Sequence, residues 1–225
     1  MMNNDRRIIK LNILLLMMGG SGTRFGAEIP KQFIQVENKP IFSYILKKYD
    51  DMEAIDKIVI VSHKDWIPYV CEWAEKLAVK KLETVVAGGD SRSSSVLNGL
   101  MAVESIAKEN DVVLIHDATH PYVDVKGTEE VIAAVTEFGG ATLGSLQYDT
   151  VYEMKEGFIA SVIPREKVVV GASPEAFQFQ KIYNIYKNAS EEELNKMTSA
   201  GAIALANDIP MKVVATNFIT FKEKR

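Results

Sequence analysis

The chain has 225 residues, a length that suits one α/β domain and is short for two. Its net charge is −4 at pH 7 with 25% charged residues, so it lacks the basic excess of a general nucleic-acid-binding protein, and we expect no nucleic-acid partner. One cysteine, Cys71, permits no internal disulfide and favours a reducing compartment.

The N-terminal segment has some features of a secretion signal, because Arg6, Arg7 and Lys10 precede an apolar run from Leu11 to Met18. The run leads directly into a glycine-rich loop without a small-x-small cleavage pattern. No stretch reaches the ~20 apolar residues that a membrane span requires. We therefore expect a cytoplasmic protein with no membrane partner, in which residues 1–10 form an N-terminal extension.

Short apolar runs then alternate with helical patterns along the chain. The expected strands are Asn12–Met18, Lys57–Ser62, Glu83–Ala87, Asp111–His116 and Ala141–Leu146. The expected helices between them are Ile41–Tyr49, Asp65–Ala78, Arg92–Ala107 and Thr128–Phe138. Each strand is a nearly unbroken apolar run, as a parallel sheet covered on both faces requires. The pattern predicts βαβ units with right-handed crossovers.

The rhythm changes after Leu146, where two short extended runs surround a turn that ends in Gly157. This pattern predicts a β-hairpin of Thr150–Met154 and Phe158–Ile163, which we expect to project as an arm at about residues 149–172. Helices are then expected at Pro174–Asn188 and Glu191–Ala206, followed by a last strand at Met211–Ala215. The sequence is thus predicted to form a single domain over residues 11–221.

The loop after the first expected strand is the most informative segment of the chain. It reads Gly19-Gly20-Ser21-Gly22-Thr23-Arg24-Phe25-Gly26, and Lys31 follows. Its glycines allow backbone N–H groups to approach phosphate oxygens, and Arg24 and Lys31 add fixed positive charge. The segment therefore predicts a polyphosphate site, with triphosphate as its natural ligand.

Two other kinds of glycine-rich loop are excluded. A P-loop requires Gly-Lys followed by Ser or Thr after a defined spacer, and no such run occurs. A dinucleotide-binding loop requires a third glycine three residues after the second, whereas Gly22 and Gly26 are four apart. The second expected strand also ends at Ser62 without the acidic residue that would bind ribose. NAD is therefore not the expected ligand.

Three motifs follow expected strands at their carboxyl ends, where ligands of open α/β sheets bind. They are the loop that begins at Gly19, the segment Gly88-Gly89-Asp90, and Asp117. We expect them to converge on one crevice. A carboxylate beside a triphosphate favours Mg²⁺, a hard ion held by one or two carboxylates and phosphate oxygens, while a structural loop aspartate is the alternative for Asp117. His116 is expected to be a structural residue at the strand end.

The chain resembles the sugar-nucleotide pyrophosphorylase-like nucleotidyltransferases, and Pro30-Lys31-Gln32 narrows the resemblance to the cytidylyltransferases that act on phosphorylated polyols. Further motifs follow in the family's order: Gly88–Arg92, Ser95–Leu100, His116-Asp117-Ala118 with Pro121, and Asp149-Thr150. The resemblance covers roughly Asn12 to Thr220. It implies a three-layer Rossmann-like α/β domain with a mostly parallel sheet and a projecting β-hairpin arm, and a homodimer formed through that arm.

The implied reaction is attack by a phosphate-monoester oxygen on the α-phosphorus of CTP, with release of pyrophosphate. Such transfer depends on alignment and charge stabilisation, for which Arg24 and Lys31 are the catalytic candidates. The resemblance implies nucleotide binding by Gly19, Gly20, Ser21, Gly22, Thr23, Gly89, Asp90, Ser95 and Ala118. It implies acceptor binding by Thr150, Arg165 and His120, with Arg165 reaching a neighbouring subunit, and Mg²⁺ binding by Asp117.

Three positions depart from the family pattern, all on the acceptor side. His120 stands in place of a permanently charged arginine, Ser199 follows Thr198 in place of an aspartate, and Asn217–Thr220 lacks its lysine. The stretches His63–Trp66 and Ser190–Glu193 favour the ribitol-5-phosphate branch. We therefore predict a CTP-dependent enzyme that makes CDP-ribitol for teichoic acid or capsule synthesis. The alternatives are 2-C-methyl-D-erythritol 4-phosphate cytidylyltransferase of isoprenoid synthesis and a catalytically silent nucleotide-binding paralogue.

Overall fold

The central feature of the computed structural model, which describes residues 10–20, 29–196 and 199–216, is a seven-stranded sheet. Its strands are β1 (Asn12–Met18), β4 (Lys57–Ser62), β5 (Leu82–Ala87), β6 (Val112–Asp117), β7 (Gly140–Leu146), β10 (Val169–Gln178) and β11 (Met211–Thr216). Their spatial order is β11-β7-β10-β6-β1-β4-β5, and every pairing is parallel except those of β10 with β6 and β7. The predicted mostly parallel sheet is confirmed.

β1 lies in the middle of this sheet, between β6 and β4. All its residues from Ile13 to Met18 are buried, which explains why the N-terminal apolar run is unbroken. Burying one such large aliphatic side chain contributes roughly 1.5–3 kcal/mol to stability. The strand that delivers the glycine-rich loop is therefore among the most firmly held parts of the molecule.

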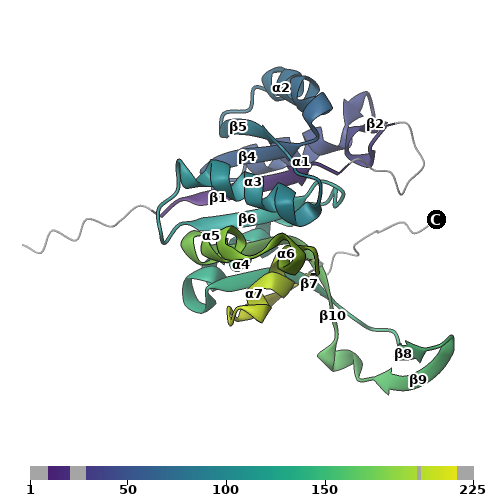
Figure 1. Cartoon of the computed structure of the whole chain (residues 1–225). Coiled ribbons are helices and arrows are strands. Elements are labelled where there is room, and N and C mark those ends of the chain that lie inside the picture. The colour runs from purple at the N-terminus through teal and green to yellow at the C-terminus, as the bar shows by residue number, and fades with distance from the viewer. Residues whose placement is uncertain (1–9, 21–28, 197–198, 217–225) are drawn as a thin grey trace, which may run out of the picture.

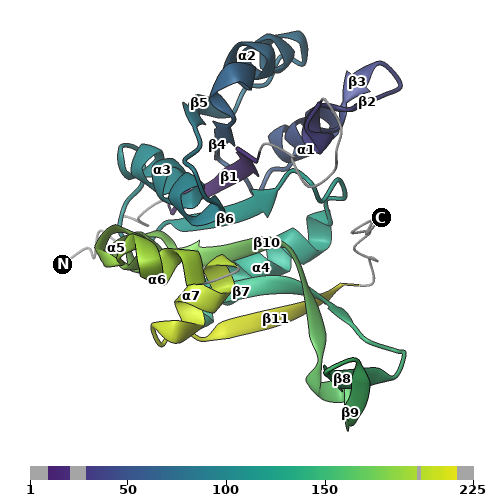
Figure 2. The same ribbon diagram turned by 45° about the vertical axis from the view of Figure 1, so that its right-hand side comes forward.

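Helices cover both faces of the sheet (Figures 1 and 2). One face carries α1 (Ile41–Asp50), α2 (Ile67–Lys76) and α4 (Val125–Phe138), and the other carries α3 (Arg92–Glu104), α5 (Phe179–Asn188), α6 (Glu191–Lys196) and α7 (Ala200–Ala206). Leu14 and Leu16 of β1 pack into the first apolar layer, whereas Ile13 and Leu15 pack into the second. This alternation is the period of two expected of a strand, and it produces the predicted three layers.

The structure corrects the predicted helix at Pro174–Asn188, because its first part belongs to β10 and helix α5 begins only at Phe179. Ala176 and Phe177 are fully buried and pair with Leu114 and Val113 of β6. A strand inserted between β6 and β7 buries these side chains on both faces, which outweighs the local helical pattern. This strand determines where Glu175 lies.

Smaller differences concern the ends of elements. The helix predicted at Asp65–Ala78 begins as a 3₁₀ turn, η3 (Lys64–Trp66), and the helix predicted at Glu191–Ala206 is divided into α6 and α7. Helix α7 begins anew after Ser199, because the Ser199 hydroxyl accepts the N–H of Ala202 and caps the helix. The sequence analysis also missed η2 (Lys31–Phe33) and the short strands β2 (Gln35–Val36) and β3 (Lys39–Pro40).

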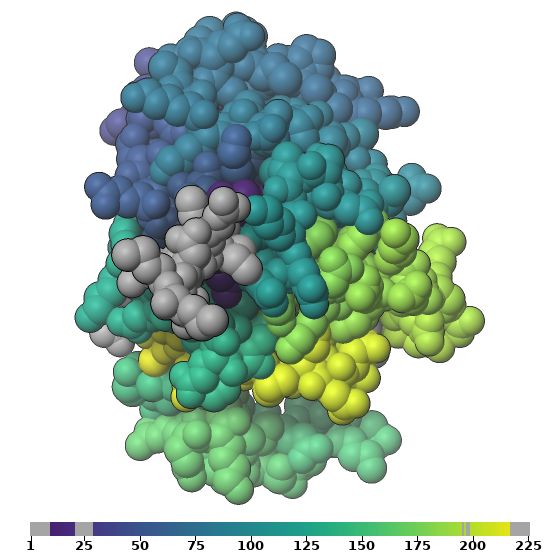
Figure 3. Space-filling view, turned by 90° about the vertical axis from the view of Figure 1, so that its left-hand side faces the viewer, coloured from purple at the N-terminus to yellow at the C-terminus, as the bar shows by residue number. Residues whose placement is uncertain are grey.

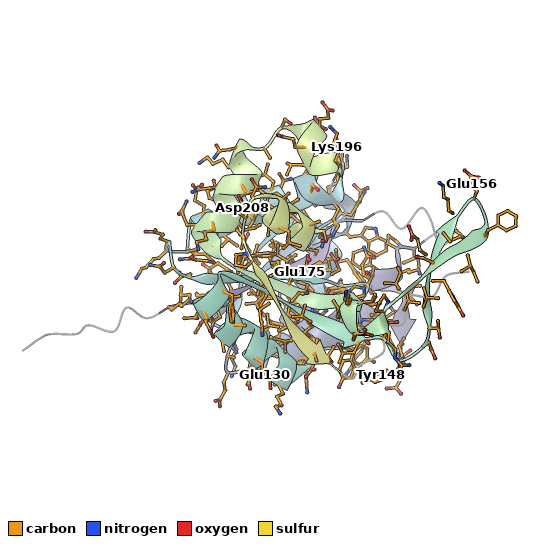
Figure 4. All side chains as sticks on the ribbon, turned by 90° about the horizontal axis from the view of Figure 1, so that it is seen from below. Glu130, Tyr148, Glu156, Glu175, Lys196 and Asp208 are labelled. Atoms are coloured by element: carbon orange, nitrogen blue, oxygen red, sulfur yellow. The ribbon has the colours of Figure 1, made fainter. Side chains whose placement is uncertain are left out.

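The predicted hairpin is present as β8 (Val151–Lys155) and β9 (Phe158–Ile163), an antiparallel pair that projects from the sheet (Figures 1 and 2). Figure 4 shows Glu156 at its tip and Tyr148 at its base. In the space-filling view the green arm and the blue helix α2 occupy opposite ends of the molecule (Figure 3). A short turn, η4 (Arg165–Lys167), leads from the arm back to β10. Within the described ranges, no helix combines the length and apolar character needed to cross a bilayer.

Candidate active site

Two glycine-containing loops meet at the carboxyl end of the sheet, as the sequence predicts. Gly19 follows β1 and Gly88 follows β5. A Cβ atom added at Gly88 would lie 3.3 Å from the Cα atom of Gly19 and 2.8 Å from the Oγ atom of Ser95. The close approach of the two backbones therefore requires glycine at position 88.

Ser95, on the first turns of α3, holds the second loop in shape. Its buried hydroxyl accepts the N–H of Gly89 at 3.0 Å and donates to the carbonyl of the same residue at 3.3 Å. Ser91 caps α3 by accepting the N–H of Ser94. The backbone around Gly89 is thus fixed before any ligand binds, and Asp90 beside it is exposed.

Gln32 connects the turn that carries Lys31 to the glycine-rich loop. Its buried side-chain Nε2 donates to the carbonyls of Met18 and Gly20, both at 3.0 Å. The next residue, Phe33, stacks on Trp66 with ring centroids 4.2 Å apart and planes inclined by 9°. These two anchors fix the backbone of Lys31. The sequence analysis gave Gln32 no role, although it belongs to the Pro30-Lys31-Gln32 motif.

Asp117 is the last residue of β6 and lies beside Met17 of β1 in the sheet. Its Oδ2 atom accepts a hydrogen bond from Nη2 of Arg92, the first residue of α3, at 3.1 Å. Burial disfavours the charged guanidinium, but the neighbouring carboxylates of Asp117 and Glu175 dominate and raise the pKa of Arg92. Asp117 is therefore part of an ion pair rather than an isolated loop carboxylate.

Glu175 of β10 brings a second carboxylate to this ion pair. Its Oε2 atom lies 3.8 Å from Nη2 of Arg92, and its two oxygens accept the N–H groups of Ala200 and Gly201 at the start of α7. Burial raises the pKa of the Glu175 carboxyl above its ordinary value. Glu175 thus places a carboxylate beside the backbone that follows Ser199. Sequence analysis missed it, because position 175 was assigned to a helix.

The donor set around Asp117 agrees with a magnesium ion bound mainly through phosphate. In the part of the chain that the structure describes, no group of three or more His, Cys, Asp or Glu side chains could hold a metal. Mg²⁺ usually binds proteins through one or two carboxylates together with substrate phosphates, so a single Asp117 suits it. Mg²⁺ binding at Asp117 stays a prediction.

His116 is structural, as the sequence analysis expected. It is fully buried, and its Nδ1 and Nε2 atoms lie 2.8 Å from the Tyr49 hydroxyl and 2.9 Å from the His120 carbonyl. A carbonyl can only accept, so Nε2 carries the proton and Nδ1 accepts from Tyr49. Burial lowers the pKa of His116 to about 4, and the imidazole is neutral at pH 7.

His120, the residue in place of the expected arginine, lies at the same edge of the sheet as Asp117. Its Nδ1 atom is 2.8 Å from the hydroxyl oxygen of Ser173, which also accepts the N–H of Asp117 at 3.4 Å. Ser173 therefore connects the backbone of Asp117, the candidate metal ligand, to the side chain of His120, the candidate acceptor-binding residue. Like Glu175, it was hidden from sequence analysis by the undetected strand β10.

The remaining predicted site residues divide between the sheet and the arm. Ala118 is buried and donates its N–H to the carbonyl of Met17 at 2.9 Å. Thr150 and Arg165 are exposed at the base of the arm, where Arg165 Nη1 donates to the Tyr148 carbonyl at 2.6 Å. Several predicted residues lie outside the described ranges: Ser21, Gly22, Thr23, Arg24, Thr198 and Asn217–Thr220.

The chain is similar in sequence to a defined group of enzymes. A family model described as 2-C-methyl-D-erythritol 4-phosphate cytidylyltransferase (IspD) matches residues 13–222. A relative of that name from Thermotoga neapolitana is 37% identical over 183 residues, which are 81% of this chain and 78% of the relative. Another from Petrotoga mobilis is 33% identical over 189 residues, 84% of this chain and 82% of the relative.

Solved structures share the fold over nearly the whole chain. The 4-diphosphocytidyl-2C-methyl-D-erythritol synthase of Anaerococcus prevotii aligns with a TM-score of 0.79 and 23% identity, covering 95% of this chain and 92% of that one. The 2-C-methyl-D-erythritol 4-phosphate cytidylyltransferase of Francisella tularensis aligns with a TM-score of 0.74 and 20% identity, covering 95% of both chains. At these identities the likeness shows a common fold.

These similarities do not support the ribitol-5-phosphate preference, since the matched family model and the relatives above carry the name of the alternative acceptor. The structure explains why the two sequence stretches misled. His63 accepts the N–H of Asp65 and Trp66 stacks on Phe33. Ser190 and Glu193 cap the start of α6 through reciprocal hydrogen bonds. Both stretches thus have local structural roles that say nothing about an acceptor.

Proposed function

We propose that this chain, which belongs to the 2-C-methyl-D-erythritol 4-phosphate cytidylyltransferase family, transfers the cytidylyl group of CTP to 2-C-methyl-D-erythritol 4-phosphate and releases pyrophosphate. Members of this family are nucleotidyltransferases, so the chain is an enzyme of that class. The observation that carries the proposal is the meeting of the Gly19 and Gly88 loops beside Asp117, with Lys31 tied to the first loop through Gln32. We place the reaction in the cytoplasm, in keeping with the single free cysteine.

The proposed chemistry requires no side-chain nucleophile. An oxygen of the acceptor phosphate forms a bond to the α-phosphorus of CTP while the bond from that phosphorus to the pyrophosphate oxygen breaks. Backbone N–H groups of the two loops and the ammonium group of Lys31 would stabilise the charge that develops on the phosphate oxygens. A magnesium ion held by Asp117 would, when bound, neutralise part of the triphosphate charge. His120 would stand near the acceptor phosphate in place of the family's arginine.

We further propose that the chain acts as a homodimer joined through the arm. Tyr152 and Met154 on β8 pair with Val162 and Ile159 on β9, and all four side chains are exposed. The other face of the hairpin is mixed: Ser161 donates to Glu153 at 2.7 Å, and the exposed Phe158 pairs with Lys155. A two-stranded hairpin is marginally stable alone, and an exposed apolar face of this kind marks a protein interface. A second copy covering this face would also bring its site toward Arg165.

The test supplies the pure protein with CTP, Mg²⁺ and one of two acceptors, 2-C-methyl-D-erythritol 4-phosphate or D-ribitol 5-phosphate, while pyrophosphate release is followed. We expect kcat/KM to be at least about tenfold higher with the first acceptor, the factor that a difference of about 1.4 kcal/mol in transition-state binding gives. A preference for D-ribitol 5-phosphate would overturn the acceptor assignment. Micromolar CTP binding without turnover of either acceptor would instead identify a silent paralogue.

A further inference from the structure

Arg92 lies between two carboxylates that come from different strands of the sheet. Its Nη2 atom donates to Asp117 of β6 at 3.1 Å, and the same atom is 3.8 Å from Glu175 of β10. The first contact is a hydrogen bond, and the second is an ion pair without one. A guanidinium group carries several N–H donors in a rigid fork, so a small side-chain movement would transfer it from one carboxylate to the other.

Tyr186 of α5 contributes a polar atom that the present arrangement leaves unused. Its side chain is fully buried, and its hydroxyl has no hydrogen-bond partner among the residues that the structure describes. Helix α5 packs in the same apolar layer as α3, the helix that begins with Arg92, and the charges of Arg92, Glu175 and Asp117 act on this hydroxyl. Buried hydroxyl groups are rarely left unpaired, so this one is available to accept a hydrogen bond.

A divalent cation on Asp117 would compete with the guanidinium group in its present place, because the two positive charges repel each other and both are attracted to the same carboxylate. Glu175 is already oriented to receive the guanidinium, since the N–H groups of Ala200 and Gly201 hold its two oxygens. A Cβ atom at position 201 would lie 2.6 Å from Oε1 of Glu175, so this glycine makes room for the carboxylate.

We propose that Glu175 and Tyr186 form a second binding position for the side chain of Arg92, which frees Asp117 to take a divalent cation when the nucleotide binds. The inference rests on the proposed function, since it assumes that a metal–nucleotide complex reaches Asp117. In the metal-free protein Arg92 neutralises and orients Asp117. In the loaded protein Arg92 donates to Glu175 and to the Tyr186 hydroxyl. Arg92, Glu175 and Tyr186 are positioning residues in this scheme.

The experiment titrates Mn²⁺ into protein with CTP and without acceptor, and follows unbound Mn²⁺ by electron paramagnetic resonance. Tyr186→Phe should weaken Mn²⁺ binding by about threefold and Glu175→Gln by about tenfold, because each variant makes the guanidinium harder to displace. Tyr186→Phe removes a hydroxyl that has no partner, so its melting temperature should not fall. A merely structural role for this hydroxyl would leave Mn²⁺ binding unchanged.

Asp50→Asn is the matched control. Asp50 is also a buried carboxylate that accepts two backbone N–H groups, from Lys80 and Lys81, and it lies 3.5 Å from the ammonium group of Lys47. This substitution should lower the melting temperature without changing Mn²⁺ affinity. The double variant Arg92→Ala with Glu175→Gln should bind Mn²⁺ as Arg92→Ala does, because Glu175 acts through Arg92.

Wild-type Mn²⁺ affinity in both Tyr186→Phe and Glu175→Gln would overturn the inference. Weaker Mn²⁺ binding by the double variant Arg92→Ala with Glu175→Gln than by Arg92→Ala alone would also overturn it. If Glu175→Gln does not fold, Tyr186→Phe alone decides. Failure of the wild-type protein to bind CTP and Mn²⁺ at all would contradict the proposed function instead, so the two failures are distinguishable.

Discussion

Gln32 illustrates how a buried, uncharged residue can control a charged neighbour. The side chain spans two carbonyls of the chain just before and inside the glycine-rich loop, those of Met18 and Gly20. Lys31 therefore cannot move relative to the start of that loop without breaking hydrogen bonds in a buried environment. Such preorganisation is what charge stabilisation in phosphoryl-type transfer requires.

Replacing Gln32 by leucine should lower both stability and turnover. The buried Met18 carbonyl and the partly buried Gly20 carbonyl would lose their donor, at a cost of about 1–3 kcal/mol in the free energy of unfolding, measured by urea denaturation. The value of kcat should fall more than the affinity for CTP, because the backbone of Lys31 loses its alignment with the loop. Gln35→Leu is the control, since Gln35 is exposed and its side-chain Nε2 donates to the Tyr69 hydroxyl at 3.4 Å. Equal kcat values in the two variants would contradict the role given to Gln32.

Lys31 itself should matter for the chemical step. We expect Lys31→Ala to reduce kcat by about 10²–10³-fold, the effect of removing one charge-stabilising donor, while CTP still binds. Pyrophosphate release under saturating substrates measures the change. Lys39→Ala, a substitution of an exposed lysine on β3, serves as the comparison and should keep the wild-type rate. A Lys31→Ala enzyme with unchanged kcat would remove this residue from the mechanism.

His116 makes stability depend on pH in a predictable direction. Its pKa is about 4 in the folded protein and near 6.5 in the unfolded chain, so the unfolded chain binds the proton more readily. The free energy of unfolding should therefore be highest above pH 6.5, and it should fall by up to about 3 kcal/mol as the pH falls toward 4. Urea denaturation at several pH values tests this. His116→Gln should make the free energy of unfolding nearly independent of pH in this range, whereas His63→Gln should keep the wild-type dependence.

At the scale of elements, the contact between the loops after β1 and β5 explains where glycine is required. Gly88→Ala would place a methyl group 2.8 Å from the Ser95 hydroxyl and 3.3 Å from the backbone of Gly19. The loops must then separate, and we expect a loss of about 1–3 kcal/mol in stability and a CTP affinity at least about tenfold weaker by calorimetry. Gly171→Ala is the control, since nothing lies within 4 Å of the added atom. Comparable CTP affinities in the two variants would show that the loop contact does not shape the nucleotide site.

Elements with a single strong local signal could be predicted from the sequence. β1, β4 and β9 have the predicted bounds because each is an apolar or alternating run between clear breaks. The strand β10 could not be recognised, since its identity depends on pairing with β6 and β7, which lie far away in the chain. Propensity is a weak guide where burial on both faces decides the conformation.

The candidate site, like the fold, could be predicted from the sequence only in part. Gly19, Gly88 and Asp117 could be brought together from sequence, because the carboxyl ends of parallel strands share one edge of the sheet. Glu175 and Ser173 could not, since they reach the site from the antiparallel strand β10. Arg92 was visible in a motif, but its pairing with Asp117 depends on a side-chain direction that spacing alone does not specify.

At the scale of the whole molecule, the sheet edge and the arm are two surfaces with different proposed functions. The sheet edge carries the loops and Asp117, while the arm presents an apolar face to solvent in a single chain. Met154 is 75% exposed there, which a free monomer would not favour. Arg165 is fixed to the base of the same arm by its hydrogen bond to the Tyr148 carbonyl. Dimer formation and acceptor binding should therefore fail together.

We expect the double substitution Met154→Lys and Ile159→Lys to yield a monomer. The two lysines would lie opposite each other on β8 and β9, and dimer formation would have to bury both charges. Light scattering coupled to size-exclusion chromatography measures the mass. The unfolding of the main domain should change little, since both side chains are exposed. Acceptor KM should rise at least about tenfold while CTP affinity is kept, if Arg165 serves the partner's site. Met101→Lys, which replaces an exposed side chain of α3 far along the chain from the arm, should remain dimeric. A monomeric wild-type protein, or a monomeric arm variant with an unchanged acceptor KM, would contradict the shared site.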